Sequence, residues 1–559
     1  MEHPLSRTAS WRARRAASWT AFGAVAGALL LLGAAAPAPA AHGAAPPVDC
    51  AALRGTAVPA AAIGLPTGGG EVTAAQQVPG TGALGAYCRV ELAVHPVDPA
   101  APDISVRIAL PDDWNRKAVM FGGGGYDGAV PDVAGNVPFG PADAGARPLA
   151  RGYATFASDS GHRSPAPDPS LDGSFARNDE ALRNFAGDAL KKTRDAALYV
   201  IGERYGEGPP ARSYFAGGST GGREALAVAQ RWPRDFDGVI SAYPAWNAAS
   251  LDLFFGYEAQ VLARPGAFLN QAEQRLLYDR VLAACDGGDG LRDGVISHEA
   301  GCRFDPRVLR CRGGADRGDT CLSDRQIRAV RALSARFTWP YRIASGETGY
   351  PGFPFLSGAD MTTPRLGMGT AAPADPMPVN SGYGVRFWDQ WVKHFVTRDP
   401  EHAALAVDPR RPGPWRDRIS ELSALQDVND PDLRPFAAAG GRLLLLHGTA
   451  DELVSHRSTV EYAERVREVM GKRAYDAFAR FYLVPGANHA NVDAAFAAGW
   501  DSLGALDAWV EQGTAPAHPV VTDNGPAGHG RTRPLCAYPA WPRYTGGAPD
   551  RAEGFRCVR

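Results

Sequence analysis

Strand-like and helix-like segments alternate along much of this 559-residue chain. From about residue 102, apolar runs such as "DISVRIALP", "KAVMFGGGG" and "GYATFASDSG" are typical of strands that end in turns. Between them lie longer segments with apolar residues at helical spacing, including 178–206 and "REALAVAQRWP". Such alternation predicts a mostly parallel sheet that is covered by helices on both faces.

The alternation stops at about residue 247 and returns with "GRLLLLHGTAD" and "RFYLVPGANH". Residues 247–432 contain four cysteines, many glycines and prolines, and clustered aromatic residues such as Phe254, Phe255, Trp339, Tyr341, Phe387, Trp388 and Trp391. We therefore expect an α/β core made of residues 41–246 and 433–559, with a large lid domain, 247–432, inserted into it. A chain of this length exceeds what one compact core usually contains.

Ser219 is the candidate nucleophile. It lies in "YFAGGSTGGREALAVAQ", where Gly217, Ser219 and Gly221 satisfy the pattern G-x-S-x-G between an apolar strand and a helix. This strand–turn–helix context is the one in which a serine stands at the tip of a sharp turn, and small neighbours keep the backbones from clashing. The alternative is a chance match in a chain with 65 glycines.

A serine hydroxyl needs a base, and in α/β-hydrolases the acid and then the histidine follow the serine in the sequence. Asp451 follows one buried strand and His489 the next, so both are expected at the carboxyl edge of the sheet. Asp451 could instead be a turn residue, and His489 a loop histidine. Of the rival histidines, His447 precedes the acid and is interpreted as structural, and His456 is expected to begin a helix.

The oxyanion of the transition state also needs hydrogen-bond donors. The N–H of Thr220, directly after the nucleophile, is one expected donor. The loop "FGGGGYDG" is expected to supply the other from Gly124 or Gly125, because glycines let backbone N–H groups face the substrate. The alternative for this loop is merely a tight turn.

The inserted segment contains a candidate metal loop, "CDGGDGLRDGVI". Asp286, Asp289 and Asp293 place three carboxylates within eight residues, and oxygen ligands of this kind suit a hard cation, above all Ca²⁺. The backbone carbonyls of Leu291 and Val295 are expected to point inward, and the metal would be structural. A solvated turn is the alternative.

The first 40 residues predict a secretory signal, since a basic stretch precedes an apolar run and small residues near Ala40. A membrane anchor is the alternative, but the apolar run is barely long enough to span a bilayer. Eight cysteines in a secreted chain favour disulfides, for which 105 pairings are possible. Nearest-neighbour pairing is the simplest: Cys50–Cys88, Cys285–Cys302, Cys311–Cys321 and Cys536–Cys557. The net charge of −2 gives no reason to expect nucleic acid as a partner.

Together these motifs resemble the tannase/feruloyl esterase family, with further support from "SDSGH" and "HGTADELVS". The resemblance extends from Cys50 to Cys557. It implies an α/β-hydrolase fold with a large lid inserted after the nucleophile helix. It also implies a triad of Ser219, Asp451 and His489, and the four nearest-neighbour disulfides. Calcium ligation is carried over to Asp286, Asp289, Leu291, Asp293 and Val295.

One departure from the family concerns two cysteines. Most members carry one just before the nucleophile and one just after the catalytic histidine, and their disulfide ties the two loops together. Gly218 and Ala490 occupy those positions here. The resemblance therefore implies that packing and hydrogen bonds hold the triad of this chain.

The first hypothesis is a secreted serine esterase that acts on small esters of aromatic acids, with no membrane association after signal cleavage. Feruloyl-type or general aromatic esters rank first, tannins second and terephthalate esters third. For terephthalate, Arg365 or Arg386 could bind the free carboxylate. The alternatives are a catalytically silent polyphenol- or carbohydrate-binding protein on this fold, and a serine peptidase.

Overall fold

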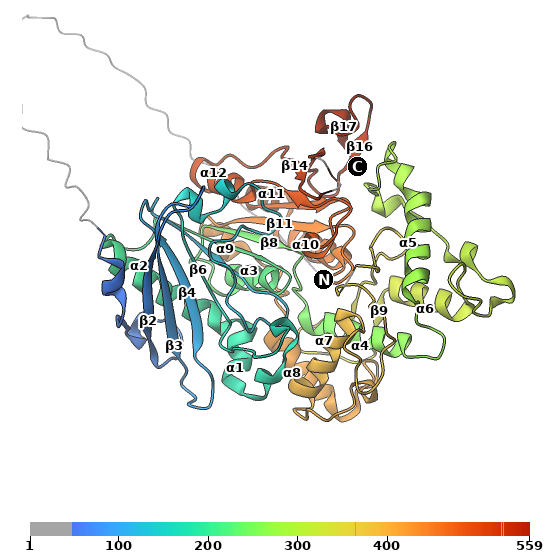
Figure 1. Cartoon of the computed structure of the whole chain (residues 1–559), viewed down its shortest axis with the longest axis horizontal. Helices are drawn as coiled ribbons and strands as arrows, with labels where there is room; N and C mark the ends of the chain where they lie inside the picture. Colours follow the sequence, from blue (N-terminus) through green and yellow to red (C-terminus); the bar gives the residue numbers. More distant parts are fainter. Residues whose placement is uncertain (1–46, 364, 527, 529) are drawn as a thin grey trace, which may run out of the picture. The chain divides into compact units, whose positions relative to one another are not determined.

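A mixed sheet of ten strands runs through the part of the chain that the computed structural model describes, residues 47–363, 365–526, 528 and 530–559 (Figure 1). The predicted signal, 1–40, lies outside these residues. In spatial order the strands are β1 (Ala57–Val58), β2 (Gly69–Val78), β3 (Tyr87–His95), β4 (Ile104–Pro111), β6 (Ala154–Ser158), β5 (Lys117–Phe121), β7 (Arg212–Gly218), β8 (Gly238–Ala242), β11 (Arg442–Gly448) and β12 (Ala479–Val484).

The sheet has an antiparallel and a parallel half. Strands β1 to β4 pair antiparallel, and β4 pairs antiparallel with β6. From β6 through β5, β7, β8 and β11 to β12, every pairing is parallel. The carboxyl ends of the parallel strands therefore meet at one edge, where ligands bind in open α/β sheets.

Helices cover both faces of the sheet, as predicted. On β7, Phe215 packs in a core with α2, α3 and α10, and its neighbours Tyr214 and Ala216 pack in another core with α12. This alternation follows from the two-residue period of a strand. The core helices are α1 (Asp179–Arg183), α2 (Ala189–Tyr205), α3 (Thr220–Arg231), α10 (His456–Met470), α11 (Lys472–Phe478) and α12 (Ser502–Gln512).

The helical segment 178–206 is interrupted rather than continuous. A π-helical turn, Asn184–Asp188, separates α1 from α2, and Gly187 within it has a φ of 143°. The guanidinium of Arg231, at the end of α3, donates to the Ala186 carbonyl at 2.8 Å, and a Cβ atom on Gly187 would lie 2.2 Å from its Nη1 atom. A residue other than glycine at 187 would meet this side chain and would be strained at that φ.

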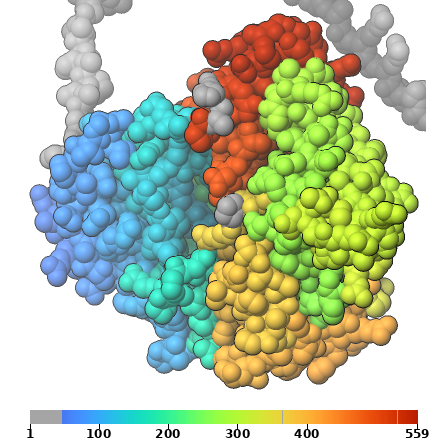
Figure 2. All heavy atoms as spheres, turned by 45° about the vertical axis from the view of Figure 1, so that its right-hand side comes forward, coloured from blue at the N-terminus to red at the C-terminus, as the bar shows by residue number. Residues whose placement is uncertain are grey.

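The inserted segment lies between β8 and β11 and, in its described residues, adds no strand to the central sheet. Phe254, Trp388 and Trp391 of the insertion are buried in a hydrophobic cluster that also contains Tyr126, Phe185 and Leu453 of the α/β core, so part of the predicted aromatic cluster is buried packing. Figure 2 shows the inserted segment, green to yellow-orange, beside the red C-terminal segment. Its elements, and α9 after it, are α4 (Ala248–Leu262), α5 (Gln271–Cys285), α6 (Asp324–Ser334), β9 (Phe337–Thr338), β10 (Gly349–Tyr350), α7 (Tyr383–Gln390), α8 (Arg416–Gln426) and α9 (Arg434–Ala438).

The C-terminal segment forms two small sheets. They consist of β13 (Ala498–Gly499), β14 (Val520–Asp523) and β15 (Thr532–Pro534), and of β16 (Trp541–Tyr544) and β17 (Phe555–Val558). Strand β15 lies beside the loop at 286–295: Arg533 in the strand pairs with the Asp293 carboxylate, and Arg531 just before it donates to the Asp293 carbonyl at 2.9 Å.

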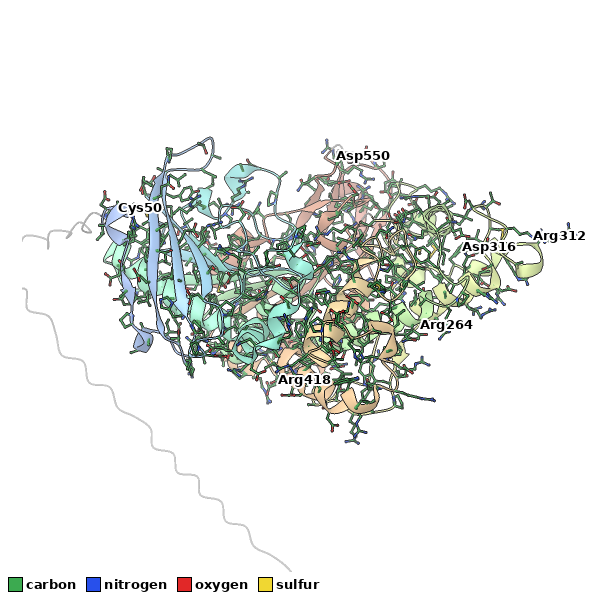
Figure 3. All side chains as sticks on the ribbon, turned by 60° about the horizontal axis from the view of Figure 1, so that its bottom comes forward. Cys50, Arg264, Arg312, Asp316, Arg418 and Asp550 are labelled. Carbon is green, nitrogen blue, oxygen red and sulfur yellow. A yellow bond between two sulfur atoms is a disulfide. The ribbon has the colours of Figure 1, made fainter. Side chains whose placement is uncertain are left out.

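The eight cysteines, all within the described residues, form the four nearest-neighbour disulfides. Their Cα–Cα separations, 4.9 to 5.6 Å, suit the disulfide bond. Cys50 lies beside the antiparallel half of the sheet, and Arg312, next to Cys311, lies with Asp316 at the outer end of the insertion (Figure 3). Within the described ranges, no helix is both long and apolar enough to cross a membrane.

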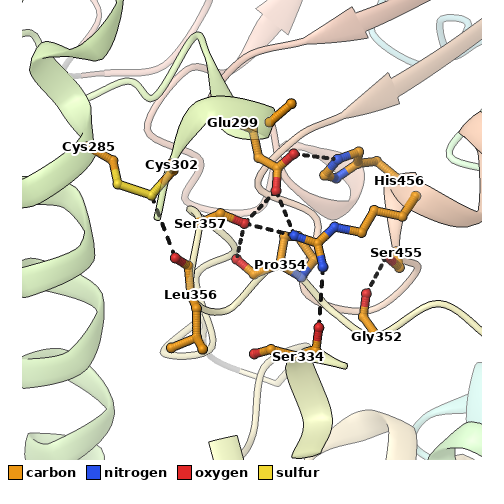
Figure 4. A network of polar contacts seen from close by, with 12 residues as sticks. Cys285, Glu299, Cys302, Ser334, Gly352, Pro354, Leu356, Ser357, Ser455 and His456 are labelled. Carbon is orange, nitrogen blue, oxygen red and sulfur yellow. Dashed lines mark hydrogen bonds and ion pairs between the residues drawn. A yellow bond between two sulfur atoms is a disulfide. The ribbon is translucent and has the colours of Figure 1, made fainter. Parts of the chain in front are cut away.

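A buried polar network joins the insertion to the start of α10 (Figure 4). Glu299 accepts from Arg457 at 2.8 Å and lies 3.3 Å from His456 Nε2. Ser357 Oγ donates to Glu299 and accepts from Arg457 at 3.0 Å. The network lies close to the Cys285–Cys302 disulfide, whose Cys302 sulfur contacts the Leu356 carbonyl (Figure 4).

Candidate active site

Ser219 lies at a sharp turn between β7, which ends at Gly218, and α3, which begins at Thr220. Its φ of 59° and ψ of −121° are strained for a residue with a side chain. The turn is so tight that a Cβ atom on Gly217 would lie 2.3 Å from the Gly221 carbonyl oxygen. The predicted strand–turn–helix context of Ser219 is confirmed.

His489 and Asp451 form a direct hydrogen bond, with 2.9 Å between His489 Nδ1 and Asp451 Oδ2. They follow β12 and β11, neighbouring parallel strands, so both stand at the edge where β7 delivers Ser219. The other oxygen of Asp451 accepts the N–H groups of Leu453 and Val454 at 2.9 and 2.7 Å. The acid is therefore fixed in one orientation, and its bond to Nδ1 leaves His489 Nε2 to act as the base.

Asp451 is completely buried. Burial by itself would raise the pKa of its carboxyl, but His489, together with a hydrogen bond from His447, holds the pKa well below its ordinary value. His447 Nε2 lies 2.9 Å from the Val454 carbonyl and 3.3 Å from Asp451 Oδ2. His447 therefore contacts the catalytic acid directly. His447 was interpreted from the sequence as structural, and this contact was not predicted. His456 is the first residue of α10, as expected.

Ser219 and His489 line the same open cavity at the edge of the sheet. In the described part of the chain no hydrogen bond joins Ser219 Oγ to His489 Nε2. Catalytic hydrogen bonds of this kind are often long in ligand-free enzymes and shorten when substrate binds. The structure therefore brings two of the three predicted residues into direct contact and places the third beside the same cavity.

Gly124 and Gly125 line this cavity with Ser219. Among the described residues, no acceptor binds the N–H groups of Gly124, Gly125 or Thr220. The Thr220 hydroxyl donates to the Gly125 carbonyl at 2.7 Å, and the Gly221 N–H donates to the Gly123 carbonyl at 3.1 Å. These bonds hold the glycine loop against the start of α3, beside the nucleophile.

A buried acid pair supports the glycine loop from behind. Glu224 on α3 accepts the Gly123 N–H at 3.0 Å, and Asp127 accepts from the Ser160 hydroxyl at 2.7 Å. Burial raises the pKa of Asp127 to about 6 and that of Glu224 well above its ordinary value. The raised pKa values mean that one of the two carboxyls tends to hold a proton, so that two adjacent buried carboxylates are not charged at the same time. Asp127, Ser160 and Glu224 lie in the motifs "GGGGYDG", "SDSGH" and "GGSTGGRE" respectively. None of them was assigned a role from the sequence.

A second, small and largely apolar cavity is lined by Ser219 and by residues of the insertion. Phe255 on α4 and Phe387 on α7 line it, so these two predicted lid aromatics do face the site. Arg365 lines the open cavity instead, and its guanidinium is paired with Asp168 at 2.8 Å. Arg386 is not part of the described lining of either cavity.

The Asp-rich loop offers oxygen atoms that fit a hard cation. Asp289 is buried, and its Oδ2 atom has no hydrogen-bond partner among the described residues. In that same part of the chain the carbonyls of Leu291 and Val295 accept no hydrogen bond. Asp286 accepts only two long bonds, both 3.2 Å, from the N–H groups of Asp293 and Gly294.

The side chains of this loop do not form a complete metal site by themselves. Asp293 uses one oxygen to pair with Arg533. Across the described ranges, no three His, Cys, Asp or Glu side chains converge tightly enough to form a metal cluster by themselves. The oxygen-only donor set still suits Ca²⁺, provided that backbone carbonyls supply part of the coordination. The calcium site stays a prediction.

The sequence model described as "Tannase and feruloyl esterase" matches residues 88–558. An uncharacterized esterase of Agrobacterium fabrum is 36% identical, with 91% of this chain and 93% of the relative covered. Mono(2-hydroxyethyl) terephthalate hydrolase of Piscinibacter sakaiensis is 29% identical, with 85% of each covered. The crystal structure of feruloyl esterase B from Aspergillus oryzae has a TM-score of 0.70 at 21% identity and covers 88% of this chain and 98% of its own. That likeness confirms the predicted α/β-hydrolase fold.

Proposed function

This chain belongs to the tannase and feruloyl esterase family of esterases, and from that premise we propose that it is a secreted serine esterase for esters of aromatic acids. The observation that carries the proposal is the Asp451–His489 hydrogen bond at the edge of the sheet where the strained turn presents Ser219. A nucleophile, a base and an orienting acid in this order are the parts of a serine hydrolase.

In the proposed acylation step, Ser219 Oγ attacks the carbonyl carbon of the ester while His489 Nε2 takes the hydroxyl proton. The carbonyl oxygen becomes an oxyanion, and the N–H of Thr220 with that of Gly124 or Gly125 donates hydrogen bonds to it. The intermediate then collapses, the C–O bond to the alcohol breaks, and His489 gives its proton to the departing alcohol.

In the proposed deacylation step, water attacks the acyl-enzyme and gives a proton to His489. The bond to Ser219 Oγ breaks, the serine regains its proton and the free acid leaves. Asp451 accepts from His489 Nδ1 throughout, which fixes the tautomer and stabilises the imidazolium. Because the pKa of Asp451 is held low, this acceptor stays ionised across the neutral and mildly acidic range.

The cavity next to Ser219 supports an aromatic acyl group, because most of the surface that its lining exposes is apolar and Phe255 and Phe387 contribute to it. The relatives include a terephthalate-ester hydrolase and probable feruloyl esterases. We rank feruloyl-type or general aromatic esters first, tannins second and terephthalate esters third. The pairing of Arg365 with Asp168 supports the low rank of terephthalate, since the guanidinium already binds a carboxylate.

Two further proposals concern a bound metal ion and the compartment in which the protein resides. We propose that the loop formed by Asp286, Asp289, Leu291, Asp293 and Val295 binds a structural Ca²⁺, with support from its unpaired oxygen atoms. We also propose that the protein is secreted, with support from its four disulfides, since such bonds persist in oxidising compartments.

The proposed function is tested by turnover of methyl ferulate, methyl gallate, monomethyl terephthalate and a peptide anilide. We expect the wild-type protein to cleave methyl ferulate, and Ser219→Ala to reduce kcat by at least about 10⁴-fold. Circular dichroism of the variant controls for folding. Cleavage of the anilide alone would favour a peptidase, and binding without cleavage of any ester would favour a silent binding protein.

A further inference from the structure

Asp252 is a buried acid in the wall of the cavity next to Ser219. It lies in the first turns of α4, in the inserted segment, and only 2% of its surface is exposed. Ser219, Phe255 and Phe387 line the same cavity. The carboxyl of Asp252 is therefore an acidic group within reach of the acyl part of a bound ester, and among the described residues that line the cavity it is the one carboxylic acid.

Within the described residues, the Asp252 carboxyl forms no hydrogen bond or ion pair, and burial together with the charges of Asp427 and Arg223 acts on it. The nearby Arg223 guanidinium donates to the backbone carbonyls of Phe185 and Gln426, at 2.9 and 3.3 Å, and not to Asp252. Buried polar groups in proteins are nearly always paired, so an unpaired one that faces a cavity indicates a ligand group that pairs with it.

The surroundings of Asp252 also favour the protonated form of its carboxyl. Burial raises the pKa of Asp252 well above its ordinary value, and the charge of nearby Asp427 raises it further, against the effect of Arg223. A protonated carboxyl can both donate and accept a hydrogen bond. Gln426, 1% exposed in the same wall, adds an amide whose oxygen accepts from Trp391 at 3.3 Å.

We propose that the Asp252 carboxyl binds a hydroxyl group on the aromatic ring of the acyl group, and so selects hydroxylated rings over unsubstituted or carboxylate-bearing rings. This inference rests on the proposed esterase function. A hydroxyl can accept from the acid or donate to it, whereas an unsubstituted ring leaves the buried acid unpaired. A ring carboxylate next to Asp252 would place two acids side by side, which disfavours the charged form of each.

The test is the ratio of kcat/KM between matched substrates within one enzyme preparation, which does not depend on the fraction of folded protein. The pairs are methyl 4-hydroxybenzoate with methyl benzoate and methyl p-coumarate with methyl cinnamate, and monomethyl terephthalate is the charged comparison. For the wild-type enzyme we expect the hydroxylated member of at least one pair to be preferred by about tenfold or more. Asp252→Leu is expected to abolish that preference, and Asp252→Asn, which keeps hydrogen-bonding atoms, is expected to retain part of it.

The matched control is Glu258→Gln. Glu258 lies on the same helix and is buried, with a pKa raised to about 8 by burial, but it is not part of the described cavity lining. Its substitution should leave the ratio unchanged. A wild-type enzyme that cleaves aromatic esters with a ratio that Asp252→Leu does not alter would overturn this inference alone. A wild-type enzyme that prefers monomethyl terephthalate to the hydroxylated esters would also overturn the inference about Asp252 alone. A wild-type protein that cleaves no ester would overturn the proposed function and this inference with it.

Discussion

At the scale of single residues, Tyr243 contacts both loops that carry the predicted nucleophile and base. Its ring packs edge-on against His489, with 4.8 Å between the ring centroids. A Cβ atom on Gly218 would lie 2.4 Å from the Tyr243 Cζ and hydroxyl oxygen atoms, so the ring fills the space beside the nucleophile turn. This contact fits the expectation that packing, rather than a disulfide between positions 218 and 490, holds these loops together.

Tyr243→Ala is expected to lower kcat by about 10- to 100-fold and to change KM much less, because small misplacements of catalytic groups slow the chemical step. Steady-state kinetics on methyl ferulate measures both constants. Tyr243→Phe serves as the control, since the tyrosine hydroxyl forms no hydrogen bond in the described part of the chain and the ring is retained. A Tyr243→Ala enzyme with wild-type kcat would show that the ring does not position the site.

At the scale of secondary-structure elements, the first turns of α10 hold the inserted segment through Glu299. Burial alone would raise the pKa of Glu299, but His456, then Arg457 and Ser357, hold it well below its ordinary value. The folded protein thus favours the carboxylate. The resulting stabilisation is present above the unfolded pKa, about 4.3, and is lost as the pH falls toward the lower folded pKa.

Glu299→Gln is expected to lower the free energy of unfolding by about 2 kcal/mol at pH 7, because it removes one partner of a buried ion pair. The difference in the free energy of unfolding between the variant and the wild-type protein should be smaller at pH 3 than at pH 7. Denaturant unfolding at both pH values measures this. Glu461→Gln, on α10, is the control: its pair with Arg336 of the insertion is partly exposed, and such pairs contribute about 0 to 1 kcal/mol. Equal effects of the two substitutions would contradict the role of Glu299.

The Asp-rich loop leads to a prediction about metal removal. Treatment with EDTA should lower the melting temperature, and Ca²⁺ should restore it, because a bound ion at 100 times its Kd stabilises a fold by about 2.7 kcal/mol. Asp289→Asn should abolish the response. Differential scanning calorimetry with and without Ca²⁺ provides the measurement, and an identical melting temperature in both conditions would argue against the site.

The break between α1 and α2 shows why element boundaries are hard to predict. Apolar residues keep their helical spacing through 178–206, so the pattern indicates helix on both sides of Gly187. The interruption coincides with the guanidinium of Arg231, which comes from α3 and binds the Ala186 carbonyl. No local pattern around residue 187 contains that information.

At the scale of the whole molecule, the parallel strands, their order along the chain and the disulfide pairing could all be predicted. Each parallel strand of the core is marked by an apolar run, and each disulfide joins neighbouring cysteines. The antiparallel strands β1 to β3, which precede the alternation, were not predicted. Ser219, Asp451 and His489 could be proposed because each follows such a run. Tyr243 could not, because its importance depends on contacts with Gly218 and His489 in other segments. Asp252 could not either, because only the folded chain places it in the wall of the cavity next to Ser219.

The inserted segment was the least predictable part of the molecule. Its clustered aromatic residues were assigned to the lid as one group, but Phe254 and Trp388 are buried in a hydrophobic cluster, whereas the exposed surface of the cavity includes Phe255 and Phe387. Neighbouring residues on one helix thus have different roles, and only the three-dimensional packing separates them.

The most direct test of the whole account is to trap the acyl-enzyme. The wild-type protein is mixed with 4-nitrophenyl ferulate, quenched with acid within the first turnover and mapped by peptide mass spectrometry. The account predicts a feruloyl group on Ser219, absent in Ser219→Ala and accumulating slowly in His489→Ala. Rapid turnover with no acyl group on Ser219, or with the group on another residue, would contradict it.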